Sequence, residues 1–133
     1  MSTRSLGSAG EESAVQYLKD HGFTVLGRNV YVGHYEIDIL ARDDTHLLFI
    51  EVKTRRQYPD TKTKFGRPAD SVDAKKRDSL VNGVRAFLRA HPDEYADLIP
   101  NIDIMEVYLD PAIDAVYHVL DIRHFRNAIN GMR

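Results

Sequence analysis

The chain contains no cysteine, and this absence removes a whole set of chemistries. Disulfides, thiolate metal sites and cysteine nucleophiles are excluded, so a bound metal would need oxygen or imidazole ligands. The six histidines include no pair at i, i+4 spacing, and no glycine-rich phosphate loop is present. We interpret the histidines as surface or turn residues, with His34 left open because it lies beside an acidic strand, and we expect no nucleotide-dependent chemistry.

Long apolar runs are also missing. No segment approaches the roughly 20 apolar residues that cross a bilayer, and residues 1–10 lack the apolar stretch of a secretion signal. We therefore expect a cytoplasmic protein with no membrane partner. A length of 133 residues suits a single domain over 1–133, and 43% hydrophobic with 29% charged residues is ordinary for a globular protein.

Charge is distributed unevenly along the chain. The formal net charge is −2, yet the segment from Lys53 to Arg77 carries +6, so the remainder carries −8. Such a basic segment can bind phosphates locally, although a solvated loop and helix start would have the same composition. The basic residues that we expect to contact nucleic acid are Arg55, Arg56, Lys62, Lys64, Arg67, Lys75 and Lys76.

Hydrophobic periodicity predicts the element order αβββαββα. Helices are expected over 11–20, 73–90 and 123–129, and strands over 23–32, 35–41, 47–54, 102–109 and 115–120. Asp73 is the expected N-cap of the long helix, His91-Pro92 its end, and 56–68 a long basic loop. Helices before, within and after the strands favour an α/β fold, in which helices flank a mixed sheet.

Acidic residues and one lysine alternate along two neighbouring predicted strands. Glu36 and Asp38 share one face of the first strand, and Glu51 and Lys53 share one face of the second. Glu-x-Lys alone is a weak motif, because these residue types alternate on the solvated face of many strands. Here, however, residues 47–50 are apolar on both faces, which is typical of a central strand where an unpaired charge is costly.

The register of these two strands decides whether the acidic groups meet. With Asp43-Asp44 as a two-residue hairpin loop, Asp38 lies opposite Phe49 and Glu36 opposite Glu51. Three carboxylates and one ammonium then converge on one surface. A slip of one residue would send them to opposite faces, so the convergence depends on the register.

Facing carboxylates repel each other, and a hard cation would relieve the repulsion. Asp38, Glu51 and Glu36 supply the oxygen ligands that Mg²⁺ or Mn²⁺ prefers, and the backbone carbonyl of Val52 is a further candidate ligand. Lys53 could orient the attacking water or contact the scissile phosphate. This combination predicts metal-dependent phosphodiester hydrolysis.

Lys76 interrupts the apolar stripe of the long predicted helix. Stepping back by four residues from Val84 through Leu80 arrives at this lysine, where the pattern expects an apolar residue. A lysine whose stem packs at the helix start while its ammonium reaches water is the commoner explanation. A contact to a substrate phosphate is the alternative.

In combination, these residues make the chain similar to a family of uncharacterised bacterial endonuclease-like (YraN-like) proteins related to archaeal Holliday junction resolvases. The similarity spans most of the chain. It is carried by Gly10-Glu11, Ala14, Tyr17-Leu18, Arg28-Asn29, Glu36-Ile37-Asp38, Phe49-Ile50-Glu51-Val52-Lys53-Thr54-Arg55, Phe65-Gly66, Lys76 and Ile102-Asp103. Two departures are Tyr35, where glycine is usual, and Asn101-Ile102, where Arg-Phe is usual.

The resemblance implies a restriction-endonuclease-like fold with Asp38, Glu51 and Lys53 at the metal and catalytic positions. It also implies a role for Glu11, the acidic residue of the first helix, in holding a second metal or a water. A favourable charge at a helix N-terminus is the alternative explanation for Glu11. Because junction-cleaving relatives commonly act as dimers, the resemblance further implies a homodimer.

The expected function is therefore Mg²⁺- or Mn²⁺-dependent hydrolysis of structured or branched DNA. A rival hypothesis is a non-catalytic nucleic-acid-binding or adaptor module that keeps the fold, whose binding would depend on salt but not on metal. A third hypothesis is a plain interaction protein, in which the basic segment is a solvated loop.

Overall fold

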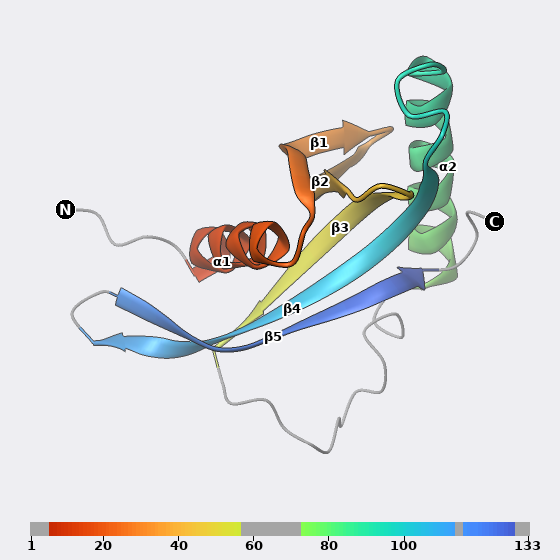
Figure 1. Ribbon diagram of the computed structural model, residues 1–133. Coiled ribbons are helices and arrows are strands. Elements are labelled where there is room, and N and C mark those ends of the chain that lie inside the picture. Colours follow the sequence, from red (N-terminus) through yellow and green to blue (C-terminus); the bar gives the residue numbers. More distant parts are fainter. Residues whose placement is uncertain (1–5, 57–72, 114–115, 130–133) are drawn as a thin grey trace.

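The computed structural model describes residues 6–56, 73–113 and 116–129. Figure 1 shows the arrangement of the helices and strands in these ranges. In chain order they are α1 (Leu6–Asp20), β1 (Thr24–Val32), β2 (Tyr35–Arg42), β3 (His46–Arg55), α2 (Ala74–Ala90), β4 (Ile99–Ile113) and β5 (Val116–Ile129). Most of the basic loop predicted at 56–68 lies outside the described residues.

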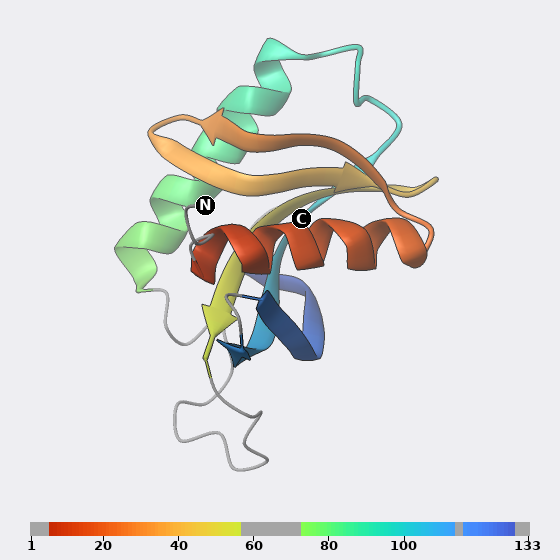
Figure 2. The same cartoon turned by 90° about the vertical axis from the view of Figure 1, so that its left-hand side faces the viewer.

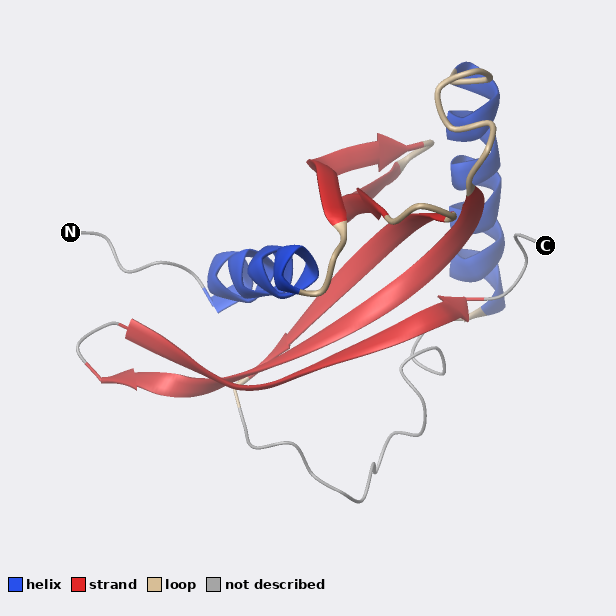
Figure 3. Ribbon diagram, viewed as in Figure 1, coloured by secondary structure: helices blue, strands red, loops and turns tan. Residues whose placement is uncertain are grey.

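The strands form one five-stranded sheet in the order β1-β2-β3-β4-β5, drawn in red in Figure 3. β3 and β4 are parallel, whereas the other neighbours are antiparallel. β3 is therefore the central strand, as its apolar run predicts. The predicted α/β fold, a mixed sheet flanked by helices, is confirmed.

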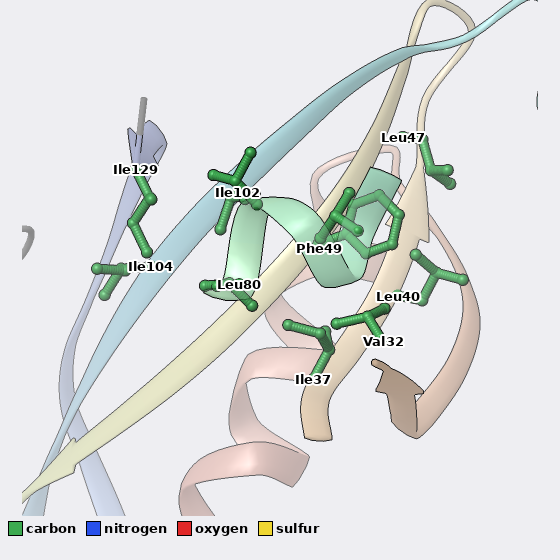
Figure 4. Close-up of a cluster of buried hydrophobic side chains, with 11 residues drawn as sticks. Val32, Ile37, Leu40, Leu47, Phe49, Leu80, Ile102, Ile104 and Ile129 are labelled. Atoms are coloured by element: carbon green, nitrogen blue, oxygen red, sulfur yellow. The ribbon is translucent and has the colours of Figure 1, made fainter. Parts of the chain in front are cut away.

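Each helix covers its own face of this sheet. Leu47 and Phe49 pack into a cluster with Leu80 of α2, whereas Leu48 and Ile50 pack into a second cluster with α1. Because side chains alternate along β3, the two clusters lie on opposite faces. Figure 4 shows the α2-side cluster, and Figure 2 shows α1 and α2 on different sides of the β1–β2 hairpin.

The ends of the helices follow local chemistry. Asp73 is the N-cap of α2, and its side chain accepts a hydrogen bond from the backbone N–H of Lys76, as predicted. α1 ends at Asp20, and the φ of 85° at Gly22 turns the chain so that the N–H of Phe23 donates to the carbonyl of Leu18 at 2.9 Å. Neither helix is long and apolar enough to span a bilayer, within the residues that the structure describes.

The predicted closing helix at 123–129 is wrong, because these residues continue β5. Phe125 pairs with Ile104 and Ile129 with Ile102, so β5 follows the buried part of β4. Without this partner, the backbone N–H and C=O groups along that edge of β4 would lose their hydrogen bonds. Tertiary pairing therefore outweighs the local pattern of residues that suggested a helix.

A close backbone contact fixes α2 against the β1–β2 turn. Gly83 is buried in α2, and a side chain there would overlap the carbonyl oxygen of Val32. On the other side of this contact, Gly33 has a φ of 65°, and a Cβ built on it would lie 3.1 Å from the Cα of Gly83. The two glycines let helix and hairpin approach more closely than side chains would allow.

We expect Gly83→Ala to lower the free energy of unfolding by roughly 1–2 kcal/mol, because overpacking outweighs the gain in helix propensity. Gly7→Ala in α1 is the matched control, since nothing lies within 4 Å of a Cβ at this position. Urea denaturation of the two variants and the wild type measures both effects. Equal stability of Gly83→Ala and the wild type would contradict this account of the contact.

Candidate active site

The β2–β3 hairpin sets the register of the candidate site. Asp43 N–H donates to the carbonyl of His46 at 3.1 Å, so the two-residue loop is Asp44-Thr45, one position later than predicted. Leu40 consequently lies opposite Phe49. The predicted pairing of Asp38 with Phe49 is therefore wrong by two residues, but a shift of two leaves the side chains of the paired residues 39–42 and 47–50 on their predicted faces.

β2 separates from β3 immediately beyond this paired region. The last pair is Ile39 with Ile50, and the next step along both strands brings Asp38 level with Glu51. In place of a backbone pair, an oxygen of the Asp38 carboxyl accepts a hydrogen bond from Val52 N–H at 2.7 Å. The Asp38 side chain thus bridges the two strands where the ladder stops.

The alternation of side chains between the two faces of β2 is broken at Asp38. In a regular strand Ile37 and Ile39 would share a face, yet Ile37 packs in the α2-side cluster and Ile39 in the α1-side cluster. In the neighbouring strand, Asn29 has a φ of 53° at the same level. This distortion lets Asp38 reach residues on both sides of the sheet.

Glu36 does not lie opposite Glu51, so its predicted place among the metal ligands is corrected. It is exposed and pairs with Tyr31 of β1, beyond the region where β2 and β3 are paired. The prediction failed because the hairpin loop is displaced and β2 diverges from β3. Asp38 takes the position across from Glu51 that was expected for Glu36.

The carboxylate of Glu51 is only partly satisfied. One oxygen lies 3.4 Å from the ammonium of Lys76, at the start of α2. The other oxygen, Oε2, is buried and has no hydrogen-bond partner. A buried carboxylate oxygen without a partner is costly, and it is the sort of group that a cation or an ordered water satisfies.

Glu11 reaches the same point from the other side of the sheet. Gly10 is buried against Thr54 of β3, where a Cβ would overlap the threonine side chain, so the start of α1 lies directly on the strand. Glu11 follows at once and lies near enough to Asp38 to hydrogen-bond to it. Glu11 from α1 and Glu51 from β3 therefore each lie near enough to Asp38 to act on its charge, although α1 and Lys76 come from opposite faces of the sheet.

This crowding of carboxyl groups changes the acidity of Asp38. Burial, with smaller contributions from the negative charges of Glu11 and Glu51, raises the pKa of Asp38 from 3.8 to about 6, even though the hydrogen bond from Val52 N–H offsets part of the increase. The ionised form of Asp38 is therefore costly near neutral pH. A cation beside the carboxyl would lower this cost.

The described residues contain no group of three or more His, Asp or Glu side chains that could hold a metal ion by themselves. A cation here would be held by Asp38 and Glu51, with water or backbone oxygens completing its shell. Mg²⁺ commonly uses one or two carboxylates and keeps several waters, so this donor set suits it. Val52 follows Glu51 on β3 and donates its N–H to Asp38, so its backbone links the two acidic residues.

Lys53 lies on the same face of β3 as Glu51. Val52 packs towards α1, so Glu51 and Lys53 on either side of it face the opposite way. Lys53 is half-buried and lies beside Glu106 in the parallel ladder of β4. Lys53 thus shares a face with Glu51, as the alternation along the strand predicts, while its place in the site and its chemical role stay predictions.

The predicted phosphate-binding residues are only partly described. Arg56 and Lys75 are exposed, Arg55 lies 4.0 Å from Glu106, and Lys76 contacts Glu51. The remaining members of the set, Lys62, Lys64 and Arg67, lie outside the described residues. The surface that the basic loop would contribute is therefore still a prediction.

Sequence reasoning missed a buried polar network on the α1 side. The carboxylate of Asp103 is fully buried and receives hydrogen bonds from His124 Nε2 and Asn127 N–H, both at 2.8 Å. Arg126 lies 3.3 Å from the same group. His124 is thus not a surface residue as predicted, and the alternation of Asp103 with buried isoleucines was the one feature that hinted at this.

A second missed network lies on the α2 side, further along the same face as Lys53. The hydroxyl of Tyr108 donates to Glu106 at 3.1 Å, and the guanidinium of Arg123 lies 5.3 Å from the centre of the Tyr108 ring. Arg123 also pairs with Asp121 at 3.1 Å. These groups satisfy one another, so we assign them to the support of the sheet.

Comparison with known proteins links this site to a family. A model of the uncharacterised protein family UPF0102 matches residues 10–107, which include every carboxylate of the site. The chain is 34% identical over 128 residues to a UPF0102 protein of Caldicellulosiruptor saccharolyticus, covering 96% of this chain and 99% of that protein. For a UPF0102 protein of Syntrophomonas wolfei, the identity is 30% over 118 residues, covering 89% and 96%. A UPF0102 protein of Bacteroides thetaiotaomicron is 39% identical over 84 residues, covering 63% and 65%.

The raised pKa of Asp38 predicts a pH-dependent cost to folding. Below about pH 4 the group is protonated in both states and costs nothing, whereas between pH 4 and 6 the folded state holds the proton more tightly. The cost therefore grows as pH rises through this window and is complete above pH 6. Asp38→Asn keeps an oxygen that can accept from Val52 N–H and removes the charge.

We expect Asp38→Asn to be more stable than the wild type at pH 7.5 without divalent cations, by about 1–2 kcal/mol after allowance for solvent screening. The difference should vanish at pH 4. Urea denaturation at both values in a chelating buffer measures it. A difference that does not change with pH would show that burial does not penalise the Asp38 charge.

Proposed function

Because the chain belongs to the uncharacterised protein family UPF0102, whose description names no activity, we propose its function from the site: metal-dependent hydrolysis of phosphodiester bonds in nucleic acid. The observation that carries this proposal is the buried, unpartnered oxygen of Glu51 beside the Asp38 carboxyl. Two neighbouring carboxyl groups at a break in a sheet destabilise the fold, so a purely structural role does not explain them. Their arrangement suits a cation that bridges them.

Asp38, Glu51 and the backbone carbonyl of Val52 would hold Mg²⁺ or Mn²⁺. When bound, the cation would make a water more acidic and neutralise the charge that develops on phosphorus. Asp38 is prepared for this role by its hydrogen bond from Val52 N–H, which fixes the position of the carboxyl group. The chain would therefore supply one carboxylate ligand from β2 and one from the central strand β3.

Lys53 is the proposed partner of the attacking water. It lies two residues beyond Glu51 on the same face, so its ammonium can orient the water or hold the scissile phosphate. Glu11 would bind a second water or cation at the α1 side of Asp38. Of the four side chains in these assignments, Glu51 and Lys53 belong to β3, whereas Asp38 and Glu11 belong to β2 and α1, which both contact β3.

The substrate that we propose is DNA with a structured or branched form. Arg55 and Arg56 follow Lys53 along the chain at the end of β3, and Lys75 and Lys76 lie at the start of α2, where Lys76 contacts Glu51. Contacts from such residues to backbone phosphates would position a substrate without reading its sequence. The resemblance to junction-resolving proteins supports the branched form and a homodimer. Both remain predictions from that resemblance.

The direct test is cleavage of labelled four-way junctions, flaps, duplexes and single strands with Mg²⁺ or Mn²⁺. We expect Glu51→Gln to reduce the cleavage rate by roughly 100-fold or more, because it removes a charged metal ligand without changing the side-chain shape. Glu36→Gln is the matched control, since Glu36 is an exposed carboxylate on β2 outside the site. It should cleave at close to the wild-type rate.

Equal rates for the wild type and Glu51→Gln on every substrate would remove the nuclease assignment. Binding that persists in a chelator, together with the absence of metal-dependent cleavage, would instead favour a non-catalytic nucleic-acid-binding module. The panel therefore separates the two functions by their dependence on metal and on Glu51.

A contact between Lys75 and a DNA phosphate would make the affinity for DNA depend more steeply on salt concentration. Lys75→Gln should make the plot of log affinity against log salt concentration less steep by roughly 0.9, the value for one lost contact to duplex DNA. Arg89→Gln, an exposed cation in the last turn of the same helix, is the control and should leave the slope unchanged. Fluorescence polarisation with labelled duplex in a chelating buffer gives both slopes, and parallel lines for Lys75→Gln and the wild type would exclude this contact.

A further inference from the structure

The ammonium of Lys76 occupies a particular place beside the candidate metal ligands. It lies 3.4 Å from Oε1 of Glu51, and the two side chains are 37% and 25% exposed. In the part of the chain that the structure describes, Lys76 is the cation that forms an ion pair with Glu51. The charge of this acidic ligand is thus partly balanced by the protein itself.

Local structure holds Lys76 at this position. Asp73 caps α2 and accepts a hydrogen bond from the Lys76 backbone N–H at 2.7 Å, which places Lys76 in the first turn of the helix. The turn is continuous with Leu80 and Val84, both buried in the α2-side cluster. Lys76 therefore lies at the end of the apolar stripe, where its stem follows the packed face and its ammonium extends to Glu51.

The ion pair satisfies only half of the Glu51 carboxylate. Oε1 faces the ammonium, while Oε2 is buried without a hydrogen-bond partner. A single ammonium at 3.4 Å is a loose contact compared with a good charge-assisted hydrogen bond. The ammonium of Lys76 therefore offsets part of the cost of burying the Glu51 charge. Because the contact is long, a cation could replace the ammonium as the partner of Glu51.

We propose that Lys76 is a built-in counter-ion that competes with the divalent cation for Glu51, so that metal binding must displace its ammonium. This inference rests on the proposed function, because it assigns the Glu51 carboxylate to a metal. Lys76 is then a positioning residue, since it acts through Glu51. Its presence lowers the affinity of the site for metal.

The test is the affinity for Mn²⁺, measured by isothermal titration of the full chain without nucleic acid. We expect Lys76→Met to bind Mn²⁺ about fivefold more tightly than the wild type, the factor that corresponds to a partly exposed ion pair of about 1 kcal/mol. Methionine keeps most of the length of the stem but carries no charge. Lys76→Arg keeps a cation and should bind Mn²⁺ with nearly wild-type affinity.

Arg77→Met controls for the general loss of positive charge at the start of α2. Arg77 is the next residue, but its guanidinium lies 3.6 Å from Asp78 and is half exposed. It should change Mn²⁺ affinity much less than Lys76→Met. Equal or weaker binding by Lys76→Met, relative to Arg77→Met, would overturn the competition.

The same titrations distinguish failure of this inference from failure of the proposed function. If the wild type binds Mn²⁺ and Glu51→Gln does not, but Lys76→Met is unchanged, only the role of Lys76 is overturned. If neither the wild type nor Lys76→Met binds Mn²⁺, the metal site and the competition both fail. Binding by Lys76→Met alone would support the competition in its strongest form.

Discussion

The hydrogen bond from Val52 N–H to Asp38 is the interaction on which the candidate site depends. Where β2 leaves β3, the central strand loses a neighbour and its backbone donor needs a new acceptor. Asp38 supplies that acceptor with a carboxyl group in place of a carbonyl. The hydrogen bond that satisfies Val52 N–H therefore also holds the carboxyl group of Asp38 level with Glu51.

This arrangement has an electrostatic cost, which the rest of the structure offsets only in part. Glu11 from α1 and Glu51 from β3 both oppose the ionisation of Asp38, and burial opposes it more strongly. Lys76 offers compensation from α2, but it contacts Glu51 and leaves one oxygen without a partner. A divalent cation beside both carboxyl groups would give the unpartnered oxygen of Glu51 a ligand and would stabilise the ionised form of Asp38.

The contrast with Asp103 shows how a purely structural carboxylate looks in the same protein. Asp103 is fully buried, yet His124, Arg126 and the backbone of Asn127 surround it with donors. Its role is to join β4 to the end of β5 on the α1 side. Glu51 lies on the adjacent central strand without such a set of partners, which is why we assign chemistry to Glu51 and structure to Asp103.

Local patterns in the sequence determined the elements that carry this site. The apolar run at 47–50 identified the central strand, and Asp73 identified the start of α2, because both depend on contacts within a few residues. Alternation also predicted that Glu51 and Lys53 share a face, and this held despite the displaced hairpin loop. A register error of two residues preserves the faces and changes only which residues are opposite.

Only the tertiary structure decided which charges meet. The divergence of β2, the close approach of Gly10 to Thr54 and the reach of Lys76 across to Glu51 join segments far apart in the chain. The strand at 123–129 likewise exists because β4 needs a hydrogen-bonding partner along its edge. Short-range preferences specify helices and strands, whereas the position of a buried charge follows from packing and from hydrogen bonds that no local pattern contains.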